Sequence, residues 1–136
     1  MDLSYLLTPF IAWLVAGTLK FLVNSIRAKK LAFGLIGYGG LPSNHSAIVA
    51  SMATLIGCRE GISHPAFGVA VTLAFIVILD ANSLRRHVGN HARAINRIAA
   101  DDTAHTMLRE RVGHTRVEIA AGILVGALVA FAICRL

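Results

Sequence analysis

Long apolar segments fill most of this 136-residue chain and constrain its fold more than any other feature. Hydrophobic residues make up 56% of the sequence. Charged residues make up only 15%, whereas soluble domains carry about 25%. A soluble domain of this size could not bury so much apolar surface. We therefore expect an integral membrane protein.

Four segments are apolar enough to enter a bilayer, namely 3–26, 46–58, 61–79 and 119–134. A hydrocarbon core of about 30 Å needs about 20 helical residues, so each helix is minimal. Segment 46–58 is too short to cross alone unless residues 41–45 enter the membrane with it as a re-entrant stretch. The pattern predicts an all-α fold. We expect a polytopic membrane helix bundle of about four short transmembrane or re-entrant helices, in one domain over 1–136.

Cytoplasmic helical segments are expected between the third and fourth apolar stretches. Residues 80–100 have a helical composition rich in alanine and arginine. Asp101, Asp102 and Thr103 are good N-cap residues, so we predict a further short helix that ends near Val112. Gly113 then interrupts the helix before the last apolar segment.

The basic residues predict the orientation in the membrane. The formal net charge is +6, and ten of the thirteen Lys and Arg residues lie in two alternate loops. These are Arg27, Lys29, Lys30, Arg85, Arg86, Arg93, Arg97, Arg109, Arg111 and Arg116. The positive-inside rule places both loops in the cytoplasm and both termini outside, in a cytoplasmic (inner) membrane. The basic excess then needs no nucleic acid partner, and it attracts anionic lipid headgroups instead.

Cys58 and Cys134 both fall near the predicted outer ends of helices. A disulfide between them is geometrically allowed. We expect two apolar, lipid-facing thiols instead.

The segment GGLPSNHSA at 39–47 is the most polar part of a stretch without charged residues. Pro42, Ser43 and Asn44 suit a helix start, where free backbone N–H groups and the helix dipole favour an anion. His45 would lie in the first helical turn and can donate a proton to a leaving oxygen there. The alternative is a simple N-cap beside a histidine without a role.

Cations flank this segment in the sequence. Lys20 and Arg27 are two helical turns apart and share a face, which predicts a bound phosphate. The alternative for Lys20 is a side chain that reaches up to the lipid headgroups. Arg85 and Arg86 follow Asp80, and paired arginines bind phosphate through their planar forks. Their alternative is a positively charged cytoplasmic flank.

The segment GHTRVE at 113–118 places His114 and Glu118 four residues apart. A carboxylate that holds one imidazole nitrogen leaves the other free to attack phosphorus. The alternative is a helix cap with an interfacial His–Glu pair. All these polar residues are predicted at the cytoplasmic ends of helices. Ionisable residues that converge there indicate a functional site, and this set describes a phosphate site.

Three ordered motifs give the chain a resemblance to a known family. It resembles the divergent branch of the type 2 phosphatidic acid phosphatase superfamily, also described as related to acid phosphatases and vanadium-dependent haloperoxidases. That branch shows Gly-Gly-Met-Pro-Ser-Ser-His-Ser, and this chain reads GGLPSNHS. It shows an aspartate and then Val-Arg-Arg-x-x-Gly, here Asp80 and LRRHVG. It shows Gly-His-Thr-Pro-x-Glu-Val, here GHTRVEI.

The wider superfamily uses Lys-x6-Arg-Pro, Pro-Ser-Gly-His and Ser-Arg-x5-His-x3-Asp. Lys20 and Arg27 are similar to the first motif, and Pro42, Ser43 and His45 to the second, with Asn44 in place of glycine. His114 and Glu118 are similar to the end of the third. The chain also departs from the patterns elsewhere, with Ala28 for proline, Leu108 for the third-motif arginine, Glu118 for aspartate and Arg116 for the branch's proline.

The resemblance implies a membrane-embedded, phosphatase-like domain that hydrolyses a lipid or isoprenyl phosphate monoester or diphosphate without a metal or other cofactor. His114 would attack phosphorus and form a phosphohistidine, Glu118 would orient it, and His45 would protonate the leaving group. Six residues would hold the phosphate, and Asp80 would support them. The six are Lys20, Arg27, Ser43, Asn44, Arg85 and Arg86.

Three other functions are compatible with the sequence. The irregular third motif allows a protein that binds or transports a lipid phosphate without turnover. His87 and His91, four residues apart, allow a metal pair with His105, although a solvated basic face explains them better. Gly122 and Gly126 allow close helix packing, either within the chain or between two copies. Because four short helices make a thin bundle, we also expect some homo-oligomerisation.

Overall fold

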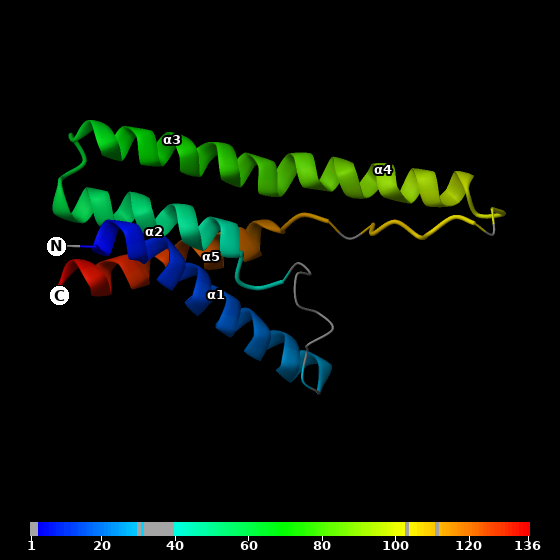
Figure 1. The fold of residues 1–136 in the computed structure, drawn as a ribbon, viewed down its shortest axis with the longest axis horizontal. Coiled ribbons are helices and arrows are strands. Elements are labelled where there is room, and N and C mark those ends of the chain that lie inside the picture. Colours follow the sequence, from blue (N-terminus) through cyan, green and yellow to red (C-terminus); the bar gives the residue numbers. More distant parts are fainter. Residues whose placement is uncertain (1–2, 30, 32–39, 103, 111) are drawn as a thin grey trace.

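The computed structural model describes residues 3–29, 31, 40–102, 104–110 and 112–136. This part of the chain contains helices and no strands, which confirms the expected all-helical fold. The elements are α1 (Ser4–Ala28), α2 (Asn44–Arg59), α3 (Pro65–Leu79), the π-helical turn η2 (Asp80–Leu84), α4 (Arg85–Ile98) and α5 (Arg116–Cys134). α3, η2 and α4 follow one another as a single long helix (Figure 1).

Three helices within the described residues are long and apolar enough to cross a membrane: α1, the α3–α4 helix and α5. Their outward faces carry large apolar side chains, among them Phe10, Phe75 and Leu124, each at least 60% exposed. Exposed apolar surface on this scale needs a nonpolar surrounding, which lipid tails supply. The chain is therefore an integral membrane helix bundle.

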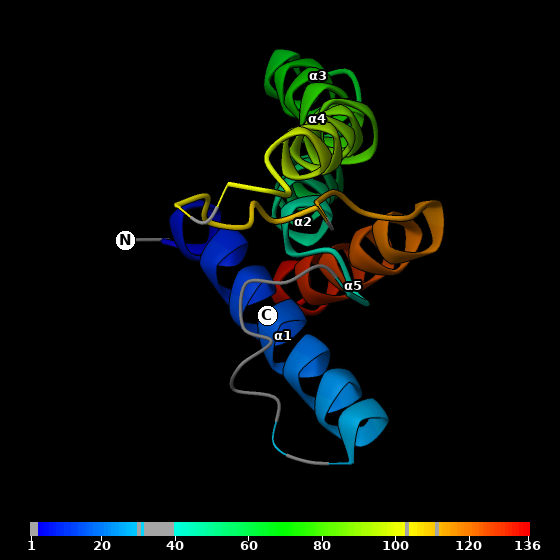
Figure 2. The same ribbon diagram turned by 90° about the vertical axis from the view of Figure 1, so that its right-hand side faces the viewer.

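α2 is the centre of the bundle and contacts α1, α3 and α5. With 16 residues it is about 24 Å long, which is less than the hydrocarbon core. Figure 2 shows α2 between α3 on one side and α1 on the other, with α5 beside it. Because neighbours surround it, α2 carries the longest set of buried residues, including Ser46, Ala47 and Leu55.

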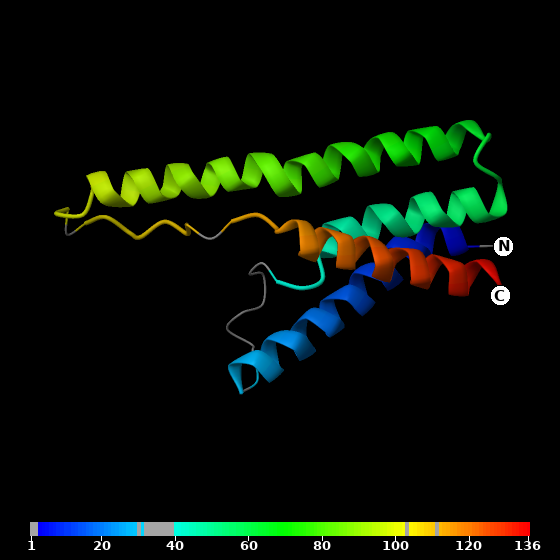
Figure 3. The same cartoon turned by 180° about the vertical axis from the view of Figure 1, so that it is seen from behind.

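α2 and α5 run parallel and approach each other at the backbone (Figure 3). Gly122 and Gly126 of α5 are buried against the first turn of α2. A Cβ atom on Gly122 would collide with the Ser43 carbonyl oxygen, and one on Gly126 with that of Ala47. The small-residue pair therefore packs within the chain, which is one of the two arrangements that its spacing allowed.

The two cysteines form a disulfide between the C-terminal ends of α2 and α5, so the expected free thiols are wrong. Parallel packing explains the pairing. The helices already touch where Ser43 meets Glu118, and Cys58 and Cys134 each lie about four helical turns beyond that contact. The sequence shows the two cysteines, but the direction in which the helices pair comes only from tertiary packing.

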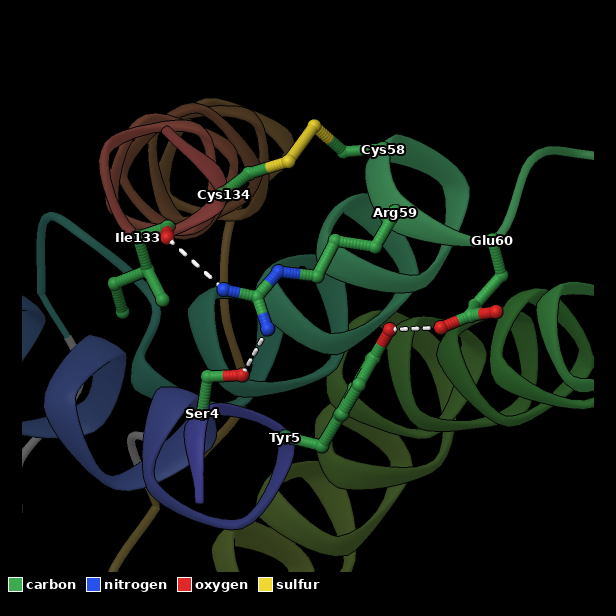
Figure 4. Close-up of a disulfide and its surroundings, with 7 residues drawn as sticks. All are labelled: Ser4, Tyr5, Cys58, Arg59, Glu60, Ile133 and Cys134. Atoms are coloured by element: carbon green, nitrogen blue, oxygen red, sulfur yellow. Dashed lines mark hydrogen bonds between the residues drawn. A yellow bond between two sulfur atoms is a disulfide. The ribbon is translucent and has the colours of Figure 1, made fainter. Parts of the chain in front are cut away.

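Arg59 joins three helices at the same end of the bundle (Figure 4). It donates to the Ile133 carbonyl of α5 at 3.3 Å and to the Ser4 hydroxyl of α1. Its guanidinium also lies 5.6 Å from the centroid of the Tyr5 ring, a cation–π distance. The Tyr5 hydroxyl donates to Glu60. These contacts close the end of the bundle that carries both termini.

The expected helix ending near Val112 is absent from the described residues of 101–112, which correct that prediction. After a turn the chain returns along α4, as Figures 1 and 3 show. Asn96 explains the extended backbone, because its side chain donates to the Leu108 carbonyl and accepts from the Leu108 N–H, both at 2.9 Å. Gly89 lets the Glu110 carbonyl approach α4, where a Cβ atom would collide with it. We call the contacts of Gly89, Arg93 and Asn96 on α4 with the returning residues 105, 108 and 110 the Asn96 clasp.

The glycine contact between α2 and α5 can be tested with a matched pair of substitutions. Gly126→Ala should lower the free energy of unfolding in detergent by about 1–3 kcal/mol, because the added methyl overpacks the contact. Gly68→Ala on α3 adds the same methyl where nothing lies within 4 Å, so it should be neutral or stabilising. Equal effects at the two positions would contradict the close contact.

Candidate functional site

The site begins where the first turns of α2 and α5 meet, at the end of the bundle opposite the disulfide. Ser43 caps α2, and its hydroxyl accepts from the Ser46 N–H at 3.4 Å and the Ser46 hydroxyl at 3.0 Å. Its backbone N–H donates to the Glu118 carbonyl at 2.9 Å. Thr115 and Glu118 form a reciprocal capping box that starts α5. Two helix N-termini, with their partial positive charges, therefore lie side by side.

His114 is buried beside this junction with only 8% of its surface exposed. Its Nδ1 lies 3.3 Å from Glu118 Oε2, so Nδ1–H donates to the carboxylate and Nε2 keeps its lone pair. The His114 backbone N–H donates to the Ala81 carbonyl at 3.0 Å. Gly113, at φ +99°, allows that close approach to Ala81 and Arg85. His114 is thus held at its ring by Glu118 and at its backbone by Ala81.

His45 lies opposite His114, with 6.0 Å between the ring centroids. Its Nε2 lies 3.3 Å from Arg85 Nη2. His45 Nδ1 and Asn44 Oδ1 are buried side-chain atoms without a hydrogen-bond partner in the described structure. Buried polar atoms normally have partners, so two unsatisfied atoms in adjacent residues mark a place where a polar ligand can bind.

The π turn η2 brings Asp80 and Arg85 together. Arg85 Nε donates to Asp80 Oδ2 at 3.1 Å. Residues five apart on an α-helix point about 140° away from each other, so an ordinary helix would separate this pair. The same turn carries the Ala81 carbonyl that holds His114. Turns of this kind often occur at functional sites. The sequence has no signal for one here, because 80–84 read as ordinary helix.

Lys20 contributes a positive charge from the middle of α1. Burial is the largest cause that lowers the pKa of His114, and the Lys20 charge is the next. The hydrogen bond and charge of Glu118 oppose these effects, and Arg85 adds to the lowering. The net direction is a His114 pKa below its ordinary value. His114 is therefore neutral near pH 7, as a nucleophile requires.

The structure separates the remaining predicted phosphate-binding residues. Arg27 is exposed in the last turn of α1, about 10 Å along the helix from Lys20. Arg86 is exposed, and its Cγ atom lies near Gly113. Ser43 is fully buried and its hydroxyl is used as a helix cap. Arg85 contacts His45, Asn44 precedes it in the chain, and the Lys20 charge acts on both histidines.

The described residues contain no group of three His, Cys, Asp or Glu side chains that could hold a metal ion. His87 and His91 are exposed on α4. His105 Nε2 lies 3.0 Å from Asn96 Oδ1 and belongs to the Asn96 clasp. In the same clasp, hydrogen bonds from Asn96 and Arg93 lower the pKa of Glu110.

The sequence analysis did not identify the residues of α4 that hold the chain leading to His114. Gly89 and Asn96 are seven residues apart, so they share a helix face, and this spacing could have been read as a packing surface. Through them the returning chain is held along α4 until Gly113. The backbone then delivers His114 to Ala81.

These observations define a membrane protein with a histidine site built on two adjoining helix N-termini. The chain belongs to the Divergent PAP2 family, whose family model matches residues 1–129. A relative named "Uncharacterized membrane protein YuiD", from Bacillus subtilis (strain 168), is 31% identical over 140 residues. The aligned part covers 90% of this chain and 89% of that protein. No solved structure matches the chain. The resemblance seen in the sequence motifs is thereby confirmed.

Two substitutions of charged residues near His114 should shift its pKa in opposite directions. Lys20→Met should raise the His114 pKa, because a neighbouring cation that disfavours the imidazolium is lost. Glu118→Gln should lower it further, because the carboxylate that favours the imidazolium is lost. Lys20→Arg keeps the charge and serves as the control. The measurement is an NMR titration of His114, and shifts of the same sign in both variants would contradict this arrangement.

Proposed function

We propose that the protein is a metal-independent phosphatase that hydrolyses a lipid or isoprenyl phosphate monoester or diphosphate through a phosphohistidine. The observation that carries the proposal is the buried His114, whose Nδ1 is paired with Glu118 and whose ring lies 6.0 Å from His45. That separation leaves both rings within reach of one phosphoryl group. The family relationship points the same way, since its name refers to PAP2 enzymes.

The reaction proceeds in two balanced steps. His114 Nε2 attacks phosphorus, the bond from phosphorus to the leaving oxygen breaks, and His45 gives that oxygen a proton. Water then attacks the phosphohistidine, His45 takes the proton from water, and the N–P bond breaks to release phosphate. Glu118 stabilises the positive charge that develops on His114. Lys20 and Arg85 offset the charge on the phosphoryl oxygens.

The place of the site supports a lipid substrate. α1, the α3–α4 helix and α5 present apolar outer faces, and the histidines lie at the ends of α2 and α5 rather than in a separate soluble domain. A phosphate on a lipid anchor can reach such a position while its chains stay in the bilayer. Phosphatidic acid, phosphatidylglycerol phosphate and isoprenyl phosphates all fit this description.

We propose further that the site faces the cytoplasm and both termini face outward, in the cytoplasmic membrane. The distribution of basic residues supports this orientation. The disulfide is independent support, because it lies at the end with both termini and disulfides persist in oxidising compartments.

The test is phosphate release from a panel of lipid phosphates by pure protein in detergent with EDTA. His114→Ala should reduce the rate at least about 1000-fold, and His45→Ala by about 100- to 10,000-fold. His87→Ala, the same change at an exposed histidine on α4, should keep the wild-type rate. In sealed vesicles of native orientation, a short-chain lipid phosphate added outside should be hydrolysed only after permeabilisation.

Three other results would contradict parts of this proposal or support the alternative. Release that survives His114→Ala would contradict the phosphohistidine. Lipid phosphate binding without release, by folded wild-type protein, would support the binding or transport alternative. Hydrolysis in sealed vesicles would contradict the orientation.

A further inference from the structure

Arg85 lies between an acid and a histidine, and its two contacts differ in strength. Its Nε donates to the Asp80 carboxylate at 3.1 Å, which is a charge-assisted bond. Its Nη2 donates to the neutral Nε2 of His45 at 3.3 Å. Arginine has donors and no acceptor, so His45 Nε2 must be the acceptor. His45 therefore carries its proton on Nδ1 in this arrangement.

In this arrangement His45 cannot donate a proton from Nε2 to a leaving oxygen. His45 Nδ1 is the buried atom without a partner, and Nε2 cannot hold a proton while Arg85 donates to it. The groups that face His45 are the cations Arg85 and Lys20, the His114 imidazole and the Asp80 carboxylate. Burial, followed by the cations and the second imidazole, lowers the pKa of His45, and an arriving negative charge would favour a second proton on this side chain.

A phosphoryl group supplies that negative charge and also competes for Arg85. Its anionic oxygens accept from guanidinium more strongly than a neutral imidazole does. The Asp80 carboxylate holds Nε throughout, so the outer part of the guanidinium can turn from His45 to phosphate about a fixed anchor. Arg86, the next residue, has no such anchor in the described structure and is exposed, which distinguishes the two arginines.

We infer that Arg85 is a latch on His45, anchored by Asp80 through the π turn, which a bound phosphoryl group releases so that His45 takes up one proton. The inference rests on the proposed phosphate site and adds a control of its proton donor. Asp80 is a positioning residue, since it acts through Arg85. The proton comes from solvent and is bound at Nε2, so anion binding and proton uptake occur together.

The experiment is NMR of the imidazole nitrogens in ¹⁵N-histidine-labelled protein, with inorganic phosphate as the probe. Before phosphate is added, His45 should be neutral with its proton on Nδ1. With saturating phosphate near pH 7 it should become the imidazolium. Asp80→Asn, which keeps the side-chain shape, should weaken phosphate binding about 10-fold. Arg97→Gln removes one charge of the opposite sign from an exposed position on the same long helix, and it should change phosphate binding less than twofold.

Three results would overturn the latch. One is a His45 that carries its proton on Nε2 before phosphate is added. Another is a phosphate affinity that Asp80→Asn and Arg97→Gln change equally. The third is a His45 that stays neutral with saturating phosphate. Because inorganic phosphate binding is measured without turnover, the result is separate from the proposed activity. Imidazolium formation at His45 without lipid hydrolysis would support the latch in a binding protein, and hydrolysis by a protein whose His45 stays neutral with phosphate would overturn the latch alone.

Discussion

The close approach of α2 and α5 at Gly122 and Gly126 fixes how these two helices, and the groups at both of their ends, are arranged. Without side chains at these positions, the α5 backbone meets the carbonyl oxygens of Ser43 and Ala47 directly. The contact sets the two helices parallel and in register, so their first turns adjoin and the Ser43 N–H reaches the Glu118 carbonyl. Both the histidine pair at one end and the disulfide at the other follow from that register.

The α3–α4 helix contributes the second half of the site through an irregularity. An unbroken α-helix would keep Asp80 and Arg85 apart. The π turn joins them, points Arg85 at His45, and carries the carbonyl that accepts from His114. The long extension of α4 also has a structural role, because Asn96 and Gly89 hold the returning chain that leads to His114. One helix therefore positions both histidines.

The sequence predicts those parts of this account that depend on periodicity and local chemistry. Hydropathy identifies the apolar helices, composition identifies α4, Ser43 is a recognisable helix start, and the spacing of His114 and Glu118 predicts their pairing. The parts that depend on tertiary packing are not predictable in this way. Cys58 and Cys134 read as lipid-facing thiols because the parallel pairing of α2 and α5 is not encoded locally. Asp102 has the side chain of a helix N-cap, so the local sequence predicts a helix after it. The backbone is extended instead because Asn96 bonds Leu108, twelve residues further along the chain, and a local pattern does not show that contact.

A covalent bond between His114 and phosphorus would distinguish the proposed hydrolysis from phosphate binding alone, and rapid-quench trapping detects such a bond. Protein mixed with a lipid phosphate labelled in its phosphoryl group would be stopped within one turnover and digested to locate the label. We expect an acid-labile, alkali-stable phosphoryl group on His114 that is absent from His114→Ala. Turnover without a labelled protein, or a label on any other residue, would contradict it.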